Sequence, residues 1–193
     1  MRPGAIVAMG LCLAVLLTGC TNEALAGQYA SGSGSGYISG DGAYTEIPIG
    51  ERDAPVVFSG TTETGATLGS ADYRSSVYVV NFWYAGCPPC RSEAPDLAAV
   101  SAKNPKVPFV GVNILDTSAT ASTFAKKFGI LYPSVIDTDA SVQLAFAGSV
   151  APNAVPTTIV IDRQGRVAAR ISGRLLEQSI LTGMIDRVVA EAP

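Results

Sequence analysis

The chain has 193 residues, of which 48% are hydrophobic and 15% are charged, and this composition excludes disorder over most of the length. The 13 Lys and Arg residues against 16 Asp and Glu residues give a formal charge of −3 without a basic run, so we expect no nucleic-acid partner. The count of 0 for His excludes Ser–His and Cys–His catalytic pairs and histidine-ligated metal sites.

The first 19 residues have the pattern of a bacterial lipoprotein signal peptide. Arg2 precedes an apolar run over residues 5–17, which is too short to span a bilayer. The run leads into the LTGC sequence of residues 17–20, which resembles the lipobox of bacterial lipoproteins. The resemblance implies that Cys20 is diacylated and anchors the chain to the outside of the cell membrane. The alternative is an ordinary secretory signal that is cleaved near residues 24–26.

A Gly/Ser-rich segment follows, and we predict a flexible tether over residues 20–46. The SGSGSG run at residues 31–36 buries too little apolar surface to fold. The alternative is that tyrosines of this segment dock on the folded part. The folded domain is predicted over residues 47–193.

The rest of the chain alternates predicted strands and helices, as in an α/β domain. A Gly/Thr-rich turn predicts an N-terminal β-hairpin over residues 56–68. Further strands are expected at residues 77–82, 107–115, 134–136, 157–161 and 167–171. Helices are expected at residues 88–103, 119–128, 142–146 and 175–190. Helical connections favour parallel strands, whereas a short turn makes the last two strands an antiparallel pair.

The motif that carries chemistry is the CPPC sequence of residues 87–90, where the 77–82 strand meets the following helix. Since proline suits a first helical turn, Cys87 is predicted to lie exposed at the helix N-terminus, where the helix dipole favours the thiolate. Cys90 is expected to be more shielded and to resolve a mixed disulfide formed by Cys87. The alternatives are half a zinc site, for which further Cys or His ligands are lacking, and an inert disulfide across a very short loop.

Residues 79–95 read VVNFWYAGCPPCRSEAP, and residues 155–158 read VPTT. These motifs closely resemble the TlpA/ResA-like thiol–disulfide oxidoreductases, extracytoplasmic members of the thioredoxin superfamily. The likeness covers about residues 54–190 and implies a thioredoxin fold with an N-terminal β-hairpin and a helix–strand insertion around residues 119–136. It also implies dithiol–disulfide exchange with client proteins, which needs the redox-active cysteine pair and no metal or other cofactor.

The resemblance assigns further site residues at the matching positions. Pro156 matches the family's cis-proline, which would set the backbone of Val155 opposite the reactive sulfur for client binding, unless it is an ordinary trans proline. Glu93 matches an acidic residue near the dithiol, and it either exchanges a proton with Cys90 or only complements the helix dipole. Trp83 either packs beneath the active-site loop and contributes to client binding or belongs to the plain core.

Two positions depart from the family pattern. Asn81 stands where many thioredoxins carry a buried acid, and because Asn cannot titrate, any proton transfer falls to Glu93. Gly86 stands where the family usually has Trp directly before the first Cys. The loss of that aromatic ring leaves the client preference and the redox potential open.

We therefore expect a membrane-tethered thiol–disulfide oxidoreductase outside the cell that acts as a reductase of client proteins with cysteine pairs, as family members do for apocytochrome c. A reductase in an oxidising compartment needs a polytopic membrane protein as electron donor. The alternatives are an oxidase that forms disulfides in secreted proteins and a non-catalytic lipoprotein that binds client peptides. A thiol peroxidase is disfavoured because Tyr84 occupies the place of the Thr that such enzymes carry.

Overall fold

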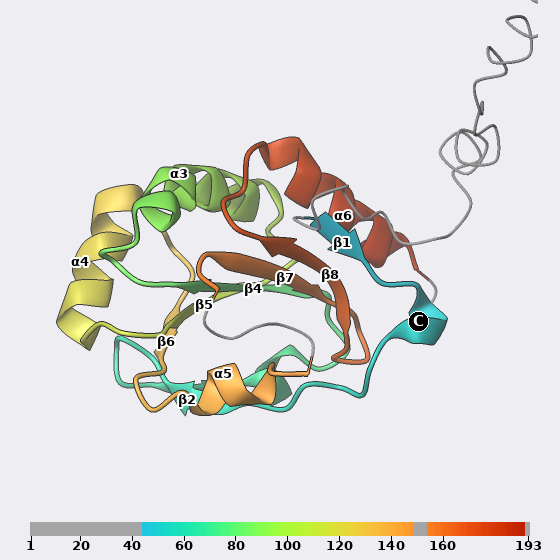
Figure 1. The fold of residues 1–193 in the computed structure, drawn as a ribbon, viewed down its shortest axis with the longest axis horizontal. Coiled ribbons are helices and arrows are strands. Elements are labelled where there is room, and N and C mark those ends of the chain that lie inside the picture. Colours follow the sequence, from blue (N-terminus) through green and yellow to red (C-terminus); the bar gives the residue numbers. More distant parts are fainter. Residues whose placement is uncertain (1–43, 149–153, 192–193) are drawn as a thin grey trace, which may run out of the picture. The chain divides into compact units, whose positions relative to one another are not determined.

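The computed structural model describes residues 44–148 and 154–191 (Figure 1). The predicted signal peptide, Cys20 and most of the predicted tether lie outside the described residues. In the part of the chain that the structure describes, no helix combines the length and the apolar character needed to cross a membrane.

A mixed sheet forms the centre of the domain, with strand order β1-β8-β7-β4-β5-β6 (Figure 1). Its strands are β1 (Tyr44–Glu46), β4 (Tyr78–Trp83), β5 (Phe109–Asn113), β6 (Ser134–Ile136), β7 (Thr157–Ile161) and β8 (Val167–Ser172). Strands β4, β5 and β6 are parallel, while β7 is antiparallel to both β4 and β8. A separate hairpin consists of β2 (Ser59–Thr61) and β3 (Thr67–Gly69).

Helices cover both faces of the sheet, and the sheet separates two hydrophobic cores. The α-helices are α3 (Pro88–Lys103), α4 (Ser118–Phe128), α5 (Ser141–Ala145) and α6 (Gln178–Ala190), and short 3-10 helices occupy Ile49–Glu51 and Ser70–Tyr73. Figure 1 shows α3 and α6 on one face and α5 with the hairpin on the other. Every residue of β4 is buried, because Val79 packs toward α3 and α6 while Val80 and Phe82 pack toward α5 and the hairpin.

The predicted thioredoxin fold with its N-terminal hairpin and helix–strand insertion is confirmed. Helix α3 has the predicted bounds, and most other elements shift by one or two residues. Helix α6 begins three residues later than predicted, at Gln178. The preceding Leu175 is buried, and its amide donates a hydrogen bond to Glu93 instead of entering the helix.

The predicted domain boundary at residue 47 is wrong, because Tyr44–Glu46 forms a strand of the sheet. Strand β1 pairs with β8, with Tyr44 opposite Ile171, and Tyr44 packs against the core beneath α6. Glu46 forms an ion pair with Arg187 of α6. The last three residues of the predicted tether therefore belong to the folded domain, since β8 offers them an edge with which to pair.

Candidate active site

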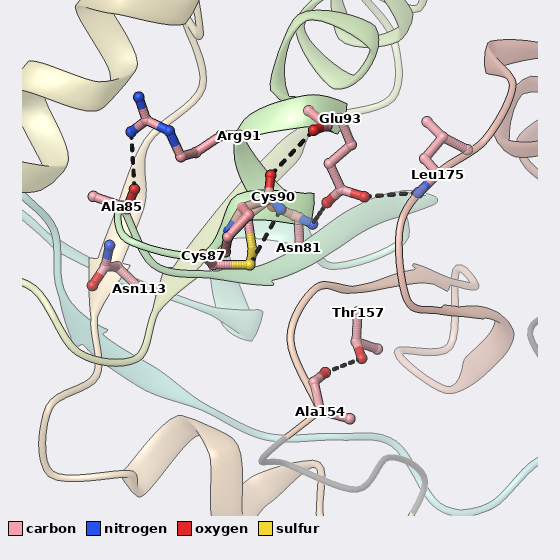
Figure 2. Close-up of a disulfide and its surroundings, with 12 residues drawn as sticks. Asn81, Ala85, Cys87, Cys90, Arg91, Glu93, Asn113, Ala154, Thr157 and Leu175 are labelled. Carbon is pink, nitrogen blue, oxygen red and sulfur yellow. Dashed lines mark hydrogen bonds between the residues drawn. A yellow bond between two sulfur atoms is a disulfide. The ribbon is translucent and has the colours of Figure 1, made fainter.

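The CPPC motif lies where β4 meets α3, as the sequence predicts. Cys87 is the N-cap of α3, both prolines lie in its first turn, and the Cys90 amide donates a hydrogen bond to Cys87 Sγ at 3.2 Å. Figure 2 shows the two sulfur atoms joined in a disulfide, with an S–S distance of 2.05 Å and a Cα–Cα distance of 5.3 Å. The structure therefore represents the oxidised state of the pair.

The prediction that Cys87 is exposed is wrong, because both cysteines are only 2% exposed. The pair packs in a hydrophobic cluster that draws on distant parts of the chain, with Phe124 from α4 and Val155 from the segment before β7. A position at a helix N-terminus would by itself leave Cys87 exposed. The packing of these distant residues in the same cluster accounts for its burial. The exposed neighbours Gly86 and Pro88 mark where the pair comes nearest to the surface.

Trp83 belongs to the same cluster as the cysteines and is only 4% exposed. Its ring centre lies 4.3 Å from that of Phe124, which the inserted helix α4 supplies. Trp83 is thus a core residue and a neighbour of the disulfide at once. Its contribution to client binding stays a prediction.

The predicted cis peptide bond is present between Val155 and Pro156. Val155 is half-buried and packs against the cluster that holds the cysteines. The segment is held by hydrogen bonds on both sides, since the Gly173 amide donates to the Pro156 carbonyl at 2.9 Å and the Thr157 hydroxyl donates to the Ala154 carbonyl. Val155 therefore lies close to the disulfide, while its pairing with a client backbone stays a prediction.

Glu93 lies one turn beyond Cys90 and is the most deeply buried carboxyl group near the disulfide, with 1% exposure. Asn81 Nδ2 donates to Glu93 Oε1 at 3.1 Å, and the Leu175 amide donates to Glu93 Oε2 at 2.8 Å (Figure 2). Burial raises the pKa of Glu93 from 4.5 to about 7, because the two hydrogen bonds and the charge of Arg174 offset the loss of hydration only in part.

This geometry argues against a role of Glu93 that is limited to the helix dipole, since such a carboxylate belongs on the exposed side of a first turn. It also explains Asn81, whose amide nitrogen is held between Glu93 and the Thr158 hydroxyl at 3.0 Å. Many thioredoxins carry an acid at the position of Asn81. In this chain, Asn81 instead donates a hydrogen bond to the carboxyl group of Glu93, which comes from α3. Glu93 is thus a buried carboxyl group with a pKa of about 7 on the helix that carries the pair, while its proton exchange with Cys90 stays a prediction.

Sequence reasoning missed a set of hydrogen bonds that hold the loop before Cys87. Asp116 Oδ2 accepts hydrogen bonds from the Ala85 amide at 2.6 Å and from Asn113 Nδ2 at 2.9 Å. On the other side, Arg91 Nη1 donates to the Ala85 carbonyl at 3.1 Å. The Ala85 peptide is therefore fixed from both sides next to the permissive Gly86. The signal in the sequence was a pair of polar residues at the end of β5, the parallel neighbour of β4.

The arrangement supports reversible thiol–disulfide exchange. Two sulfur atoms lie within bonding distance, a carboxyl group able to gain and lose a proton lies one turn away, and the segment with the cis-proline lies close by. Among the described residues, no group of three or more Cys, Asp or Glu side chains is arranged to hold a metal ion.

Comparison with known proteins identifies the family. Residues 49–185 match the Redoxin family model. The thiol:disulfide interchange protein HelX of Rhodobacter capsulatus is 32% identical over 161 residues, which cover 81% of this chain and 88% of HelX. The thiol-disulfide oxidoreductase ResA of Geobacillus kaustophilus is 33% identical over 112 residues, which cover 57% of this chain and 62% of ResA.

A solved structure agrees with these relatives. The crystal structure of a DsbF homologue from Corynebacterium diphtheriae has a TM-score of 0.67 and 34% sequence identity, covering 78% of this chain and 96% of that one. The family match spans most of the described domain, including the disulfide, Glu93 and Pro156. The chain therefore belongs to the Redoxin family and is a thioredoxin-superfamily thiol–disulfide oxidoreductase of the TlpA/ResA/DsbE type.

Proposed function

We propose that this oxidoreductase is tethered to the outer side of the cell membrane and reduces disulfides in client proteins. The observation that carries the proposal is the CPPC disulfide at the start of α3, beside the cis-proline segment and one turn from a carboxyl group with a pKa of about 7. A pair of this kind can pass two electrons to a client and return to the disulfide state.

In the reductase cycle, the thiolate of Cys87 attacks one sulfur of a client disulfide. The client S–S bond breaks, a mixed disulfide with Cys87 forms, and the departing client sulfur takes up a proton. Cys90 then gives its proton to Glu93 and attacks Cys87 Sγ, so that the Cys87–Cys90 bond forms and the bond between Cys87 and the client breaks. The second client sulfur leaves as a thiolate and takes up a proton from water. Two electrons have moved to the client, and the Cys87–Cys90 disulfide of the structure is the product.

The buried carboxyl group of Glu93 supports the second step. With a pKa of about 7 it is partly ionised at neutral pH, so it can accept a proton from Cys90 and return it when the disulfide is reduced again. Asn81 and the Leu175 amide hold both carboxyl oxygens, which keeps the group in place as its charge changes.

Sequence features support the proposed location and partners of the enzyme. The LTGC motif supports lipid attachment at Cys20, and the Gly/Ser-rich segment after it suits a tether. Each turnover leaves the pair oxidised, so a membrane protein with its own dithiol must return two electrons. The family resemblance supports apocytochrome c as a client whose cysteine pair needs reduction.

The mechanism is tested by the reduction of insulin disulfides with the mature chain in detergent. We expect Cys87→Ser to abolish turnover and Cys90→Ser to accumulate a mixed disulfide, detected by mass spectrometry. Cys20→Ser, which removes only the proposed lipid site, serves as the control and should retain turnover. Full activity of Cys87→Ser would contradict the mechanism.

The direction of transfer is tested by equilibrating the pair with glutathione buffers of known ratio. A reductase is expected to have a potential closer to the thioredoxin value of about −270 mV than to the value of about −120 mV typical of a strong oxidant. A potential near the oxidant value would favour the alternative, a disulfide-forming oxidase.

Anchoring is tested in cells by labelling with a palmitate analogue that carries an alkyne group. The wild-type chain should carry the label and Cys20→Ser should lose it. A labelled Cys20→Ser chain, or an unlabelled wild-type chain, would contradict the proposed lipid anchor.

The burial of both cysteines favours one second candidate, a lipoprotein that holds client peptides beside the cis-proline segment without turnover. Peptide binding by a Cys87→Ser, Cys90→Ser double variant separates the two candidates. Undiminished binding, together with no turnover by the wild-type chain, would favour the binding protein.

A further inference from the structure

A groove lies beside the disulfide, between the first turns of α3 and the inserted helix α4. It consists of two adjoining hollows that share Arg91 and Lys127, and Phe128 lines one of them while Phe124 lines the other. Gly86 and Pro88, which flank Cys87 in the sequence, line one of them. A chain that brings a cysteine to Cys87 therefore has this groove as its immediate surroundings. We name it the α3–α4 groove.

Positive charge gathers in the α3–α4 groove. The Arg91 guanidinium carbon and the Lys127 ammonium nitrogen each lie 5.6 Å from the centre of the Phe128 ring. Both side chains are exposed, and neither forms an ion pair with any carboxylate in the described part of the chain. Helix α4 itself, with the sequence SATASTFAKKF, carries no acidic residue. Two like charges around one ring repel each other, and an anion between them would relieve this repulsion.

We propose that the α3–α4 groove binds an acidic segment of the client, next to the cysteine that Cys87 attacks. The inference rests on the proposed function and names its substrate class: protein disulfides flanked by Asp or Glu. Carboxylates would meet Arg91 and Lys127, while the apolar stems of the client side chains would pack on Phe128 and Phe124. The groove is locally positive, whereas the whole chain has a formal charge of −3. This local charge would also steer acidic segments toward the site.

The experiment uses three peptides with the same internal disulfide and with acidic, neutral or basic residues beside one cysteine. The full mature chain in detergent is assayed for kcat/KM on each peptide. We expect the acidic peptide to be reduced faster than the neutral one by about two- to five-fold, and the basic one more slowly, as for exposed charge pairs. The preference should vanish as salt is raised from about 0.02 to about 0.5 M.

Variants locate the preference in the groove. Lys127→Gln and Lys127→Glu should reduce the ratio of acidic to neutral kcat/KM, and Lys127→Glu should reverse it. The adjacent Lys126→Gln is the matched control, because Lys126 is exposed on the same helix and does not line the groove. An unchanged ratio in both Lys127 variants, or an equal loss in Lys126→Gln, would overturn the inference.

The outcomes separate this inference from the proposed function. If no peptide is reduced, the proposed reductase is wrong. If all three peptides are reduced at equal rates, the reductase stands and the acidic client is wrong. If glutathione disulfide, a small anionic compound, shows the dependence on Lys127 while the peptides do not, the groove serves a small molecule and the inference is likewise overturned.

Discussion

Two buried carboxylates lie near opposite ends of β7 and have opposite surroundings. Glu93, near the disulfide, receives hydrogen bonds from the neutral groups of Asn81 and Leu175. Asp162, which follows β7 at its other end, is 2% exposed and forms ion pairs with Arg52 at 2.9 Å and with Arg166 at 2.8 Å. The two sites have similar burial, so the difference lies in the partners.

The partners decide what each carboxylate contributes. Asp162 has two cations, and Arg52 also binds Glu191 near the C-terminal end of the domain, with a contact of 2.5 Å. This cluster connects three distant segments of the chain. Glu93 has no ion-pair partner among the described residues, and its pKa is raised to about 7. Asp162 is thus buried with cations that compensate its charge, whereas Glu93 is buried without one, and its pKa is raised.

The largest expected effect is the loss of Arg52. Arg52→Met leaves Glu191 without its cation and Asp162 with one cation instead of two, so we expect the free energy of unfolding to fall by about 3–5 kcal/mol. Urea denaturation of the oxidised protein measures it. A loss below about 1 kcal/mol would show that the cluster does not tie the segments together.

The second prediction concerns Glu93 and pH. The folded carboxyl group has a pKa of about 7 and its ordinary value is 4.5, so the folded state binds more protons than the unfolded state between these pH values. The free energy of unfolding should therefore fall by up to about 3 kcal/mol as pH rises through this window. Glu93→Gln lacks this pH dependence. The variant still loses some free energy of unfolding at every pH, because the amide offers one acceptor oxygen for two donors.

Urea denaturation of both proteins between about pH 5 and about pH 8 measures the difference. Glu93→Gln should gain stability relative to the wild type as pH rises, and its insulin-reduction rate should lose the inflection near pH 7. Stability curves that run parallel over this range would contradict the raised pKa. The Arg52→Met variant is the matched control, because it should retain the Glu93 inflection.

An intermediate effect is expected for Asp116, whose carboxylate accepts a hydrogen bond from a backbone amide instead of pairing with a cation. Asp116→Ala removes the acceptor of the Ala85 amide and should cost about 1–2 kcal/mol of stability. The released loop should also show faster hydrogen exchange at Ala85, measured by mass spectrometry. Unchanged exchange there would show that Asp116 does not fix the loop before Cys87.

The smallest effect is expected for the exposed ion pair between Arg187 and Glu46. The Arg187 side chain is 60% exposed, so Arg187→Ala should change the free energy of unfolding by about 0.5 kcal/mol or less. Comparison with Arg52→Met in the same denaturation experiment then measures the effect of burial on an ion pair. Equal losses in the two variants would remove the distinction on which the comparison depends.

Local sequence was enough to predict the elements that position the motif. The apolar run before the CPPC motif predicts a buried strand, and the two prolines predict the first turn of α3, whose bounds agree with the prediction. The spacing between Cys90 and Glu93 places them on one face of the helix. These features depend on neighbours within a few residues, which the sequence states directly.

Contacts between distant segments could not be predicted in this way. The carboxyl group of Glu93 accepts a hydrogen bond from the amide of Leu175, 82 residues away in the sequence. Arg52 likewise pairs with Asp162, 110 residues away. The cover over Cys87 likewise comes from α4 and from Val155, so helix position alone gave the wrong exposure. No local pattern specifies such pairs, because they are set by the packing of the whole domain.

The two outermost strands of the sheet, β1 and β6, have three residues each. Strand β1 pairs with three of the six residues of β8, and β6 is partly covered by an antiparallel bridge between Thr62 and Val135. Edge strands this short leave few unpaired backbone groups with which another polypeptide can form strand-to-strand hydrogen bonds. A variant that starts at residue 47 would lack β1 and expose the longer edge of β8. We expect such a variant to aggregate by strand addition, which residues 44–46 prevent in the complete domain.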